Sequence, residues 1–262
     1  CAFLNAETAS GLDPLSGSRL GLVDPACIRQ ASACFGTALN AFSSKMGECL
    51  LIIAGFGDSI TRGVFVEEHC YLNVLAAMTG ASVINAGIPG QTSTHAIGRL
   101  DSDVLSRNPD LCIVAFGMND HVCKAPDTPK TPAAQFKENL RTICSRLAAN
   151  KIKAVLCTVH PIIEGNEAAY YYARHPKEWY RNPPGAQARI EMYNEAIREA
   201  ARLEGALLAD VAEHWRRALA GGCRLEDLLL TVENFGKDDG VHPNAKGHRL
   251  YAECIAEKIA DL

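Results

Sequence analysis

The sequence predicts an α/β fold: a three-layer α/β/α sandwich around an open, mostly parallel five-stranded sheet. Short apolar runs alternate along the chain with longer amphipathic segments. The short runs are apolar throughout, which is typical of strands that helices cover on both faces. The segments between them are long enough for the right-handed crossovers that connect parallel strands.

The predicted elements follow one another from residue 50 onward. The expected strands, in order, are residues 50–56, 82–85, 111–116, 153–159 and 206–209. One helix is expected after each strand, near residues 67–78, 94–107, 132–150, 185–204 and 245–261. Residues 1–45 show little periodicity and carry Gly, Ser and Asp-Pro turn signals. We therefore expect an N-terminal extension of unknown role over residues 1–45 and one domain over residues 46–262.

Composition excludes several classes of protein. The 262 residues carry a formal net charge of −4, with 48% hydrophobic and 21% charged residues, so the chain can bury a large core. No block of like charge marks a surface for nucleic acid or anionic lipid. The longest apolar runs are far short of the ~20 residues that span a bilayer. We expect a partner that is a small molecule, and the oligomeric state stays open.

The eleven cysteines stand singly, without a Cys-x-x-Cys pair, and their number is odd. We interpret them as reduced thiols, which favours the cytoplasm. Cys112 and Cys157 lie inside apolar runs, where a thiol packs as a small hydrophobic group. The Cys and His residues show no metal-ligand spacing, so no metal is expected. A chain that begins at Cys1 fits, as an alternative, a lipoprotein anchored through that residue.

Ligands of parallel α/β folds bind beyond the carboxyl ends of the strands, so the residues that follow each strand are the candidates for function. Gly57-Asp58-Ser59 follows the first strand. A dinucleotide fingerprint is excluded because Ile60 stands where the third glycine belongs, and a P-loop because Gly-Lys-Ser/Thr is missing. The nucleophile elbow of α/β-hydrolases would need glycine at Thr61. What remains is a serine exposed at a strand end, or a plain helix N-cap.

The later strand ends supply the other parts of an acyl-transfer site. Gly87 and Asn119 follow the second and third strands, and Asp239 stands three residues before His242 near the C-terminus. Each alone fits an ordinary turn or cap. Together with Ser59 they provide a nucleophile, a base with an orienting carboxylate, and donors for an oxyanion from Ser59 N–H, Gly87 N–H and the Asn119 amide.

At these residues the sequence resembles the SGNH, or GDSL, hydrolase family over roughly residues 50–262. Gly57-Asp58-Ser59 is similar to the family's first block, Gly87 to the second, Gly117-x-Asn119-Asp120 to the third and Asp239-x-x-His242 to the fifth. The resemblance implies a flavodoxin-like sandwich that needs no cofactor. It implies Ser59 as nucleophile and oxyanion donor, Gly87 and Asn119 as further donors, His242 as base and Asp239 as its orienter.

The expected function is therefore the hydrolysis of carboxylic esters, with short acyl groups such as acetyl. Thioester or lysophospholipid hydrolysis uses the same chemistry and is the alternative within the family. A catalytically silent module that binds an acyl group or a sugar is the alternative of another class. Such a module would be expected to lack Ser59, Asp239 or His242, and the sequence has all three.

The substrate pocket is sought among residues near the same strand ends. Asp58 precedes the serine, and His121 and His160 follow the third and fourth strands. The long connection of residues 161–184 contains five aromatic residues, Tyr170, Tyr171, Tyr172, Trp179 and Tyr180. A connection of that length suggests a function. We expect a lid or wall over Ser59 in which Tyr171 and Trp179 contact substrate, or else aromatic rings packed on the core or a second subunit.

Overall fold

The computed structural model describes residues 51–260 and 262. The predicted extension of residues 1–45, and Cys1 with it, lie outside the described residues. Within the described residues, no helix is both long and apolar enough to cross a membrane.

The centre of the domain is a parallel sheet of five strands. They are β1 (Ile52–Gly57), β2 (Ser82–Gly87), β3 (Leu111–Ala115), β6 (Lys153–Cys157) and β7 (Leu207–Ala209). Their order is β2-β1-β3-β6-β7, and every neighbouring pair is parallel. This confirms the predicted sheet, because each predicted strand is present within a few residues of its expected ends. The short hairpin of β4 (Cys123–Ala125) and β5 (Thr128–Pro129) was not predicted.

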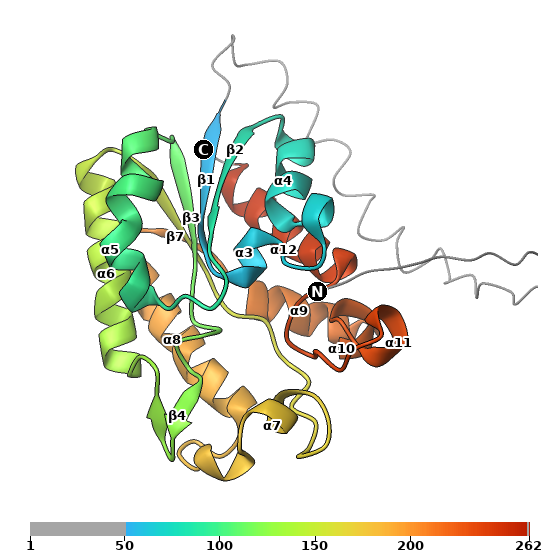
Figure 1. Ribbon diagram of the computed structural model, residues 1–262. Coiled ribbons are helices and arrows are strands. Elements are labelled where there is room, and N and C mark those ends of the chain that lie inside the picture. The colour runs from blue at the N-terminus through green and yellow to red at the C-terminus, as the bar shows by residue number, and fades with distance from the viewer. Residues whose placement is uncertain (1–50, 261) are drawn as a thin grey trace, which may run out of the picture. The chain divides into compact units, whose positions relative to one another are not determined.

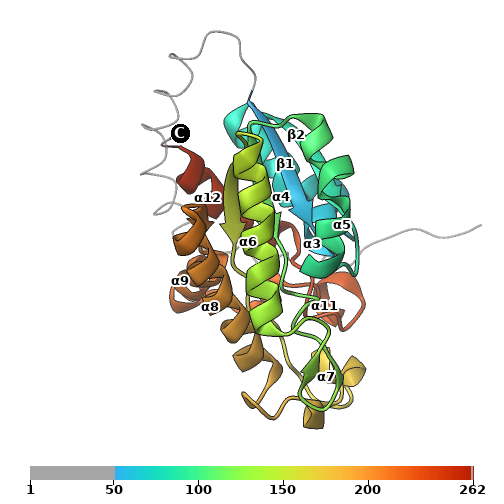
Figure 2. The ribbon, with the colours of Figure 1, turned by 90° about the vertical axis from the view of Figure 1, so that its left-hand side faces the viewer.

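Helices cover both faces of the sheet (Figures 1 and 2). One layer holds α5 (Ser93–Asp103), α6 (Ala133–Ala149) and α8 (Ala186–Glu204), and the other holds α4 (Tyr71–Thr79), α12 (Ala245–Ile259) and α9 (Val211–Ala220). Short helices are α3 (Ser59–Arg62), α7 (Tyr171–Arg174), α10 (Leu225–Leu228) and α11 (Val232–Phe235). Three-residue 3-10 turns span Glu67–His69, Leu105–Arg107 and Lys177–Trp179. The five predicted helices are all present, and the three-layer fold is confirmed.

Helix α9 was missed, although its signals are in the sequence. Asp210 caps it, because the side chain accepts a hydrogen bond from the N–H of Glu213. Val211, Trp215 and Leu219 follow at four-residue spacing, which places them on one face. Val211 and Trp215 are fully buried.

The core includes most of the described cysteines as well as the aliphatic side chains. Cys112 and Cys157 lie in the central strands and are buried, as predicted for structural thiols. Cys70, Cys123, Cys144 and Cys254 are buried too. Burial raises the pKa of the Cys144 and Cys254 thiols to about 12 and that of the Cys112 and Cys157 thiols further. These groups are therefore protonated and apolar in character.

Candidate active site

Three of the predicted residues lie on two elements at the carboxyl edge of the sheet. Ser59 is the first residue of α3 and follows directly after β1 and Asp58. Asp58 is the N-cap of α3, and its Oδ1 accepts a hydrogen bond of 2.9 Å from the N–H of Ile60. Asp239 and His242 lie in the turn that leads into α12. Chain positions separated by more than 180 residues thus meet at one point.

The side chains of Ser59, His242 and Asp239 form a continuous chain of hydrogen bonds. His242 Nε2 lies 3.0 Å from Ser59 Oγ, and His242 Nδ1 lies 2.9 Å from Asp239 Oδ2. Because a carboxylate only accepts, Nδ1 carries the proton and Nε2 is free to accept that of the serine. The side chains of His242 and Asp239 are 21% and 17% exposed, so the site is open to solvent.

Asp239 is held ionised and in place by its own turn. Its Oδ1 accepts from the N–H of Val241 at 2.9 Å and from the N–H of His242 at 2.6 Å. Burial alone would raise the pKa of Asp239. The hydrogen bond from the His242 ring, the electrostatic attraction to His242 and the two backbone N–H groups have the larger effect together, and they hold the pKa below its usual value. A carboxylate of this kind can stabilise an imidazolium.

Asn119 is hydrogen-bonded to Asp58, the residue before Ser59. Its Nδ2 donates to Asp58 Oδ2 at 3.1 Å, which fixes the direction of the amide and leaves its second hydrogen available. Asp58 is only 2% exposed, and burial raises its pKa from 3.8 to about 6. The expectation that Asp58 lines a substrate pocket is corrected, because its carboxylate faces Ile60 and Asn119 inside the protein.

Gly87 has a packing role in the structure, and its N–H is not available as an oxyanion donor. Its N–H donates to Asn85 Oδ1 at 3.0 Å, so it is already engaged. A Cβ at Gly87 would lie 2.3 Å from the backbone nitrogen of Arg62, so only glycine lets the end of β2 approach α3 this closely. The expectation of Gly87 as an oxyanion donor is therefore corrected.

The next glycine is the better candidate. The N–H of Gln91 donates to the carbonyl of Ile88, which closes a turn with Pro89 and Gly90 at its centre. Gly90 has φ +77°, as the third position of a type II turn requires. Its N–H has no hydrogen-bond acceptor among residues 51–260. The Pro-Gly pair in the sequence was the signal that could have identified it.

His160 and His121 are buried supports of the site and not walls of a pocket. Both are 0% exposed. His160 Nε2 donates to Val241 O at 2.8 Å, beneath the Asp239 turn, and its Nδ1 lies 2.7 Å from the hydroxyl of Tyr251. His121 Nδ1 donates to Gly117 O at 3.2 Å. Burial lowers the pKa of His160 to about 4 and that of His121 to about 3, so both rings are neutral near pH 7.

The aromatic rings of residues 161–184 mostly face inward. Tyr171, Tyr172 and Tyr180 are 2%, 5% and 3% exposed, and Trp179 packs against the core. Tyr171 Oη bonds to Tyr180 Oη at 2.8 Å and to His121 Nε2 at 3.0 Å. Figure 1 shows α7 beyond the carboxyl ends of the strands. Core packing thus replaces the expected substrate contacts of Tyr171 and Trp179.

Sequence reasoning missed the aromatic residue that does lie open beside the base. Phe65 is 49% exposed and has φ +72°. Its ring contacts the His242 ring edge to face, with the two ring centroids 5.4 Å apart. On its other partner, Phe235 of α11, the ring centroid lies 5.0 Å from that of Phe65. Phe65 lies in an ordinary-looking stretch after α3, so the sequence carried no signal for it.

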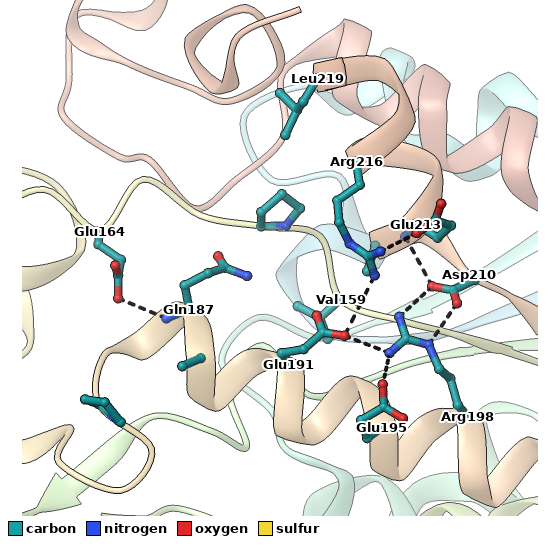
Figure 3. A pocket seen from close by; sticks show the side chains of 14 residues that line it. Val159, Glu164, Gln187, Glu191, Glu195, Arg198, Asp210, Glu213, Arg216 and Leu219 are labelled. Carbon is teal, nitrogen blue, oxygen red and sulfur yellow. Dashed lines mark hydrogen bonds and ion pairs between the residues drawn. The ribbon is translucent and has the colours of Figure 1, made fainter. Parts of the chain in front are cut away.

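A wide cleft of about 1000 Å³ lies between α8 and α9 (Figure 3). Ser59, His242 and Asp239 do not line it. Arg198 crosses from α8 to Asp210 at 2.8 Å and also pairs with Glu191 at 2.7 Å. Arg216 on α9 pairs with Glu213. These charges satisfy one another in the cleft wall, which joins the two helices to the end of β7.

The described residues contain no cluster of three or more His, Cys, Asp or Glu side chains arranged for a metal ion. The site that the geometry offers is a serine activated by a histidine, with nearby N–H groups. Such an arrangement can transfer an acyl group from an ester to water.

Comparisons with known proteins find a matching family and several relatives. Residues 56–250 match the GDSL-like Lipase/Acylhydrolase family. The lipoprotein YqeF of Bacillus subtilis (strain 168) is 30% identical over 215 residues, which cover 78% of this chain and 88% of that protein. An acetylxylan esterase of Geobacillus stearothermophilus is 24% identical over 184 residues, covering 69% and 73%. The structure of the lipase/acylhydrolase from Enterococcus faecalis has a TM-score of 0.61 at 24% identity, covering 81% of this chain and 96% of that one.

Proposed function

Because the chain belongs to the GDSL-like lipase/acylhydrolase family, we propose that it is a serine hydrolase of carboxylic esters with Ser59 as its nucleophile. The observation that carries the proposal is the unbroken hydrogen-bond chain from Ser59 through His242 to Asp239. A complete chain of this kind also argues against the silent binding module.

The proposed reaction has two halves. His242 Nε2 takes the proton of Ser59 Oγ as that oxygen attacks the ester carbonyl carbon, and the imidazolium is stabilised by Asp239. The same proton then passes from Nε2 to the departing alcohol, which leaves an acyl group on Ser59. In the second half His242 removes a proton from water, the resulting oxygen nucleophile attacks the acyl carbon, and Ser59 regains its proton as the acid leaves.

The oxyanion formed in each half needs preorganised donors. We assign this role to the N–H of Ser59, the second amide hydrogen of Asn119 and the N–H of Gly90. No hydrogen bond within the described chain occupies the Ser59 or Gly90 N–H. Removing a single donor of this type typically lowers kcat by about 10²–10³.

The proposed substrates are esters of short acyl groups, acetyl first among them. The relative named as an acetylxylan esterase supports this choice. The open, partly apolar surface of Phe65 beside His242 supports an alcohol part larger than the acyl part, because the departing alcohol must lie next to the base that protonates it. Thioesters and lysophospholipids are the alternative substrates of the same site.

The test compares Ser59→Ala and His242→Ala with the unchanged protein on p-nitrophenyl esters of increasing acyl length and on acetylated sugars. Each variant should lose at least about 10³-fold in kcat, since nucleophile and base act as a unit. Ser106→Ala is the control, because this serine is exposed and its hydroxyl donates to the carbonyl of Ser102. Turnover near that of the control in either variant would refute the assignment.

We also propose that the protein is a lipoprotein anchored through Cys1. The name of the Bacillus relative supports the alternative of a lipoprotein over the expected cytoplasmic location. Metabolic labelling of the expressed protein with a radioactive fatty acid tests it, and recovery of all the protein unlabelled in the cytosolic fraction would exclude the anchored form.

A further inference from the structure

The turn that carries Asp239 is held from two sides. The carboxylate is held from within by Val241 and His242, as described above. The backbone carbonyls of residues 238–240 point the other way, toward residues 163–174. Three successive carbonyls there accept hydrogen bonds from that segment.

Arg174 makes two of these three bonds. Its guanidinium donates to Asp238 O at 2.8 Å and also to Asp239 O. Within the described part of the chain no other group donates to either carbonyl. The third bond runs from the N–H of Ile163 to Gly240 O at 2.9 Å. The planar fork of an arginine directs two N–H groups at two neighbouring acceptors in a fixed geometry, whereas a lysine offers a single nitrogen on a flexible stem.

The contact between the segment and the turn is tight as well as polar. The N–H of Tyr170 donates to Asp238 Oδ2 at 3.1 Å. Gly240 has φ +67°, and a Cβ there would lie 2.7 Å from Tyr170 Cδ1. The Tyr170 ring therefore packs directly on the backbone of the Asp239 turn. A shift of residues 170–174 would displace that turn.

From these contacts we propose that Arg174 is a positioning residue that sets the place of the Asp239 carboxylate relative to His242. The proposal rests on the hydrolase mechanism above and assigns residues 163–174 to it as an outer support. Arg174 is exposed, so its bonds contribute little to the stability of the fold. Catalysis is more sensitive, because a displacement of about 1 Å can cost about 10²-fold in rate.

The experiment compares Arg174→Ala and Arg174→Lys with the control Arg181→Ala. Arg181 is an exposed arginine of the same connection, but its Nε donates to Glu178 O, within the connection itself. We expect Arg174→Ala to lower kcat by about 10- to 100-fold, with KM changed less than about twofold and the melting temperature within about 3 °C. Arg174→Lys should lie between, since it keeps the charge and a donor but loses the rigid fork.

Two readouts separate positioning from a general loss of structure. Guanidinium ion below denaturing concentration should restore part of the activity of Arg174→Ala and none to Arg181→Ala. The low-field proton resonance of His242 Nδ1–H should shift or broaden in Arg174→Ala only. Lost activity without rescue, an unchanged resonance, or a kcat equal to that of the control would each overturn the proposal. Activity retained by Ser59→Ala would instead overturn the hydrolase mechanism, so the two failures are distinguishable.

Discussion

At the scale of single residues, Asp58 has the least ordinary environment at the site. One of its oxygens caps α3 and the other holds the amide of Asn119. Burial makes its charged form costly and raises its pKa to about 6. The carboxylate thus orients a donor at the expense of stability, a conflict found at many functional sites.

Replacing Asp58 with asparagine should separate these two effects. An asparagine has one acceptor oxygen, so it can serve Ile60 or Asn119 but not both, and we expect kcat to fall by about 10- to 100-fold. The variant should gain stability relative to the unchanged protein above pH 6, where the buried charge costs on the order of 3 kcal/mol.

The sign of this pH dependence follows from the raised pKa. Below pH 3.8 the carboxyl group is protonated in both folded and unfolded chains, so ionisation contributes no difference. Between pH 3.8 and about 6 the unfolded chain ionises first, and the unchanged protein loses stability as the pH rises. Urea unfolding of both proteins at pH 4 and pH 8 measures the effect. If the two proteins differed in free energy of unfolding by the same amount at pH 4 and pH 8, the raised pKa of Asp58 would be contradicted.

How far the sequence determines such a site differs from residue to residue. Ser59, His242 and Asp239 were predicted to meet because each follows a strand end or precedes the last helix, and in the structure their side chains are within hydrogen-bond distance. Gly87 was misassigned because a sequence does not tell which way an N–H points. Only the Asn85 side chain, folded back onto Gly87, reveals that this donor is engaged.

At the scale of elements, the long connection of residues 161–184 was recognised by its length, but its role was left open between a substrate wall and rings packed on the core or a second subunit. Five aromatic residues fit a substrate wall as well as an inner cluster, because composition does not say which way a ring faces. The strands and long helices were predictable since their periodicity reflects burial directly. Helix α9 and the β4–β5 hairpin are short and depend on tertiary contacts for their stability.

Tyr171→Phe tests the inner cluster. The change removes the hydroxyl that bonds to His121 Nε2 and to Tyr180 Oη, and it leaves a buried ring nitrogen without a partner. We expect the free energy of unfolding to fall by about 1–3 kcal/mol, measured by urea denaturation. The order of preference among the ester substrates should stay the same, because the ring is buried.

Tyr170→Phe is the matched control for that change. Tyr170 is only partly buried, and within residues 51–260 its hydroxyl makes no hydrogen bond. Its removal should leave the free energy of unfolding within about 0.5 kcal/mol of the unchanged value. A changed order of substrates in Tyr171→Phe, without loss of stability, would favour a substrate wall after all.

At the scale of the whole molecule, activity should be independent of the core thiols. Six of the described cysteines are buried, and burial raises the pKa of Cys112, Cys123, Cys144, Cys157 and Cys254. Since the thiolate is the reactive form, brief treatment of the native protein with N-ethylmaleimide at pH 7 should leave more than about 80% of the activity. A serine-directed phosphonate should abolish it. Rapid loss to the maleimide would mean that a thiol takes part in the reaction.

The same packing changes what the six buried cysteines imply about the surroundings of the protein. A sulfur that neither ionises nor meets solvent reacts slowly with peroxide or with disulfide exchange partners, whatever the redox potential outside. Persistence as a thiol is then a kinetic property of the core and needs no external supply of reductant. The domain would keep these sulfur atoms unchanged on either side of a cell membrane.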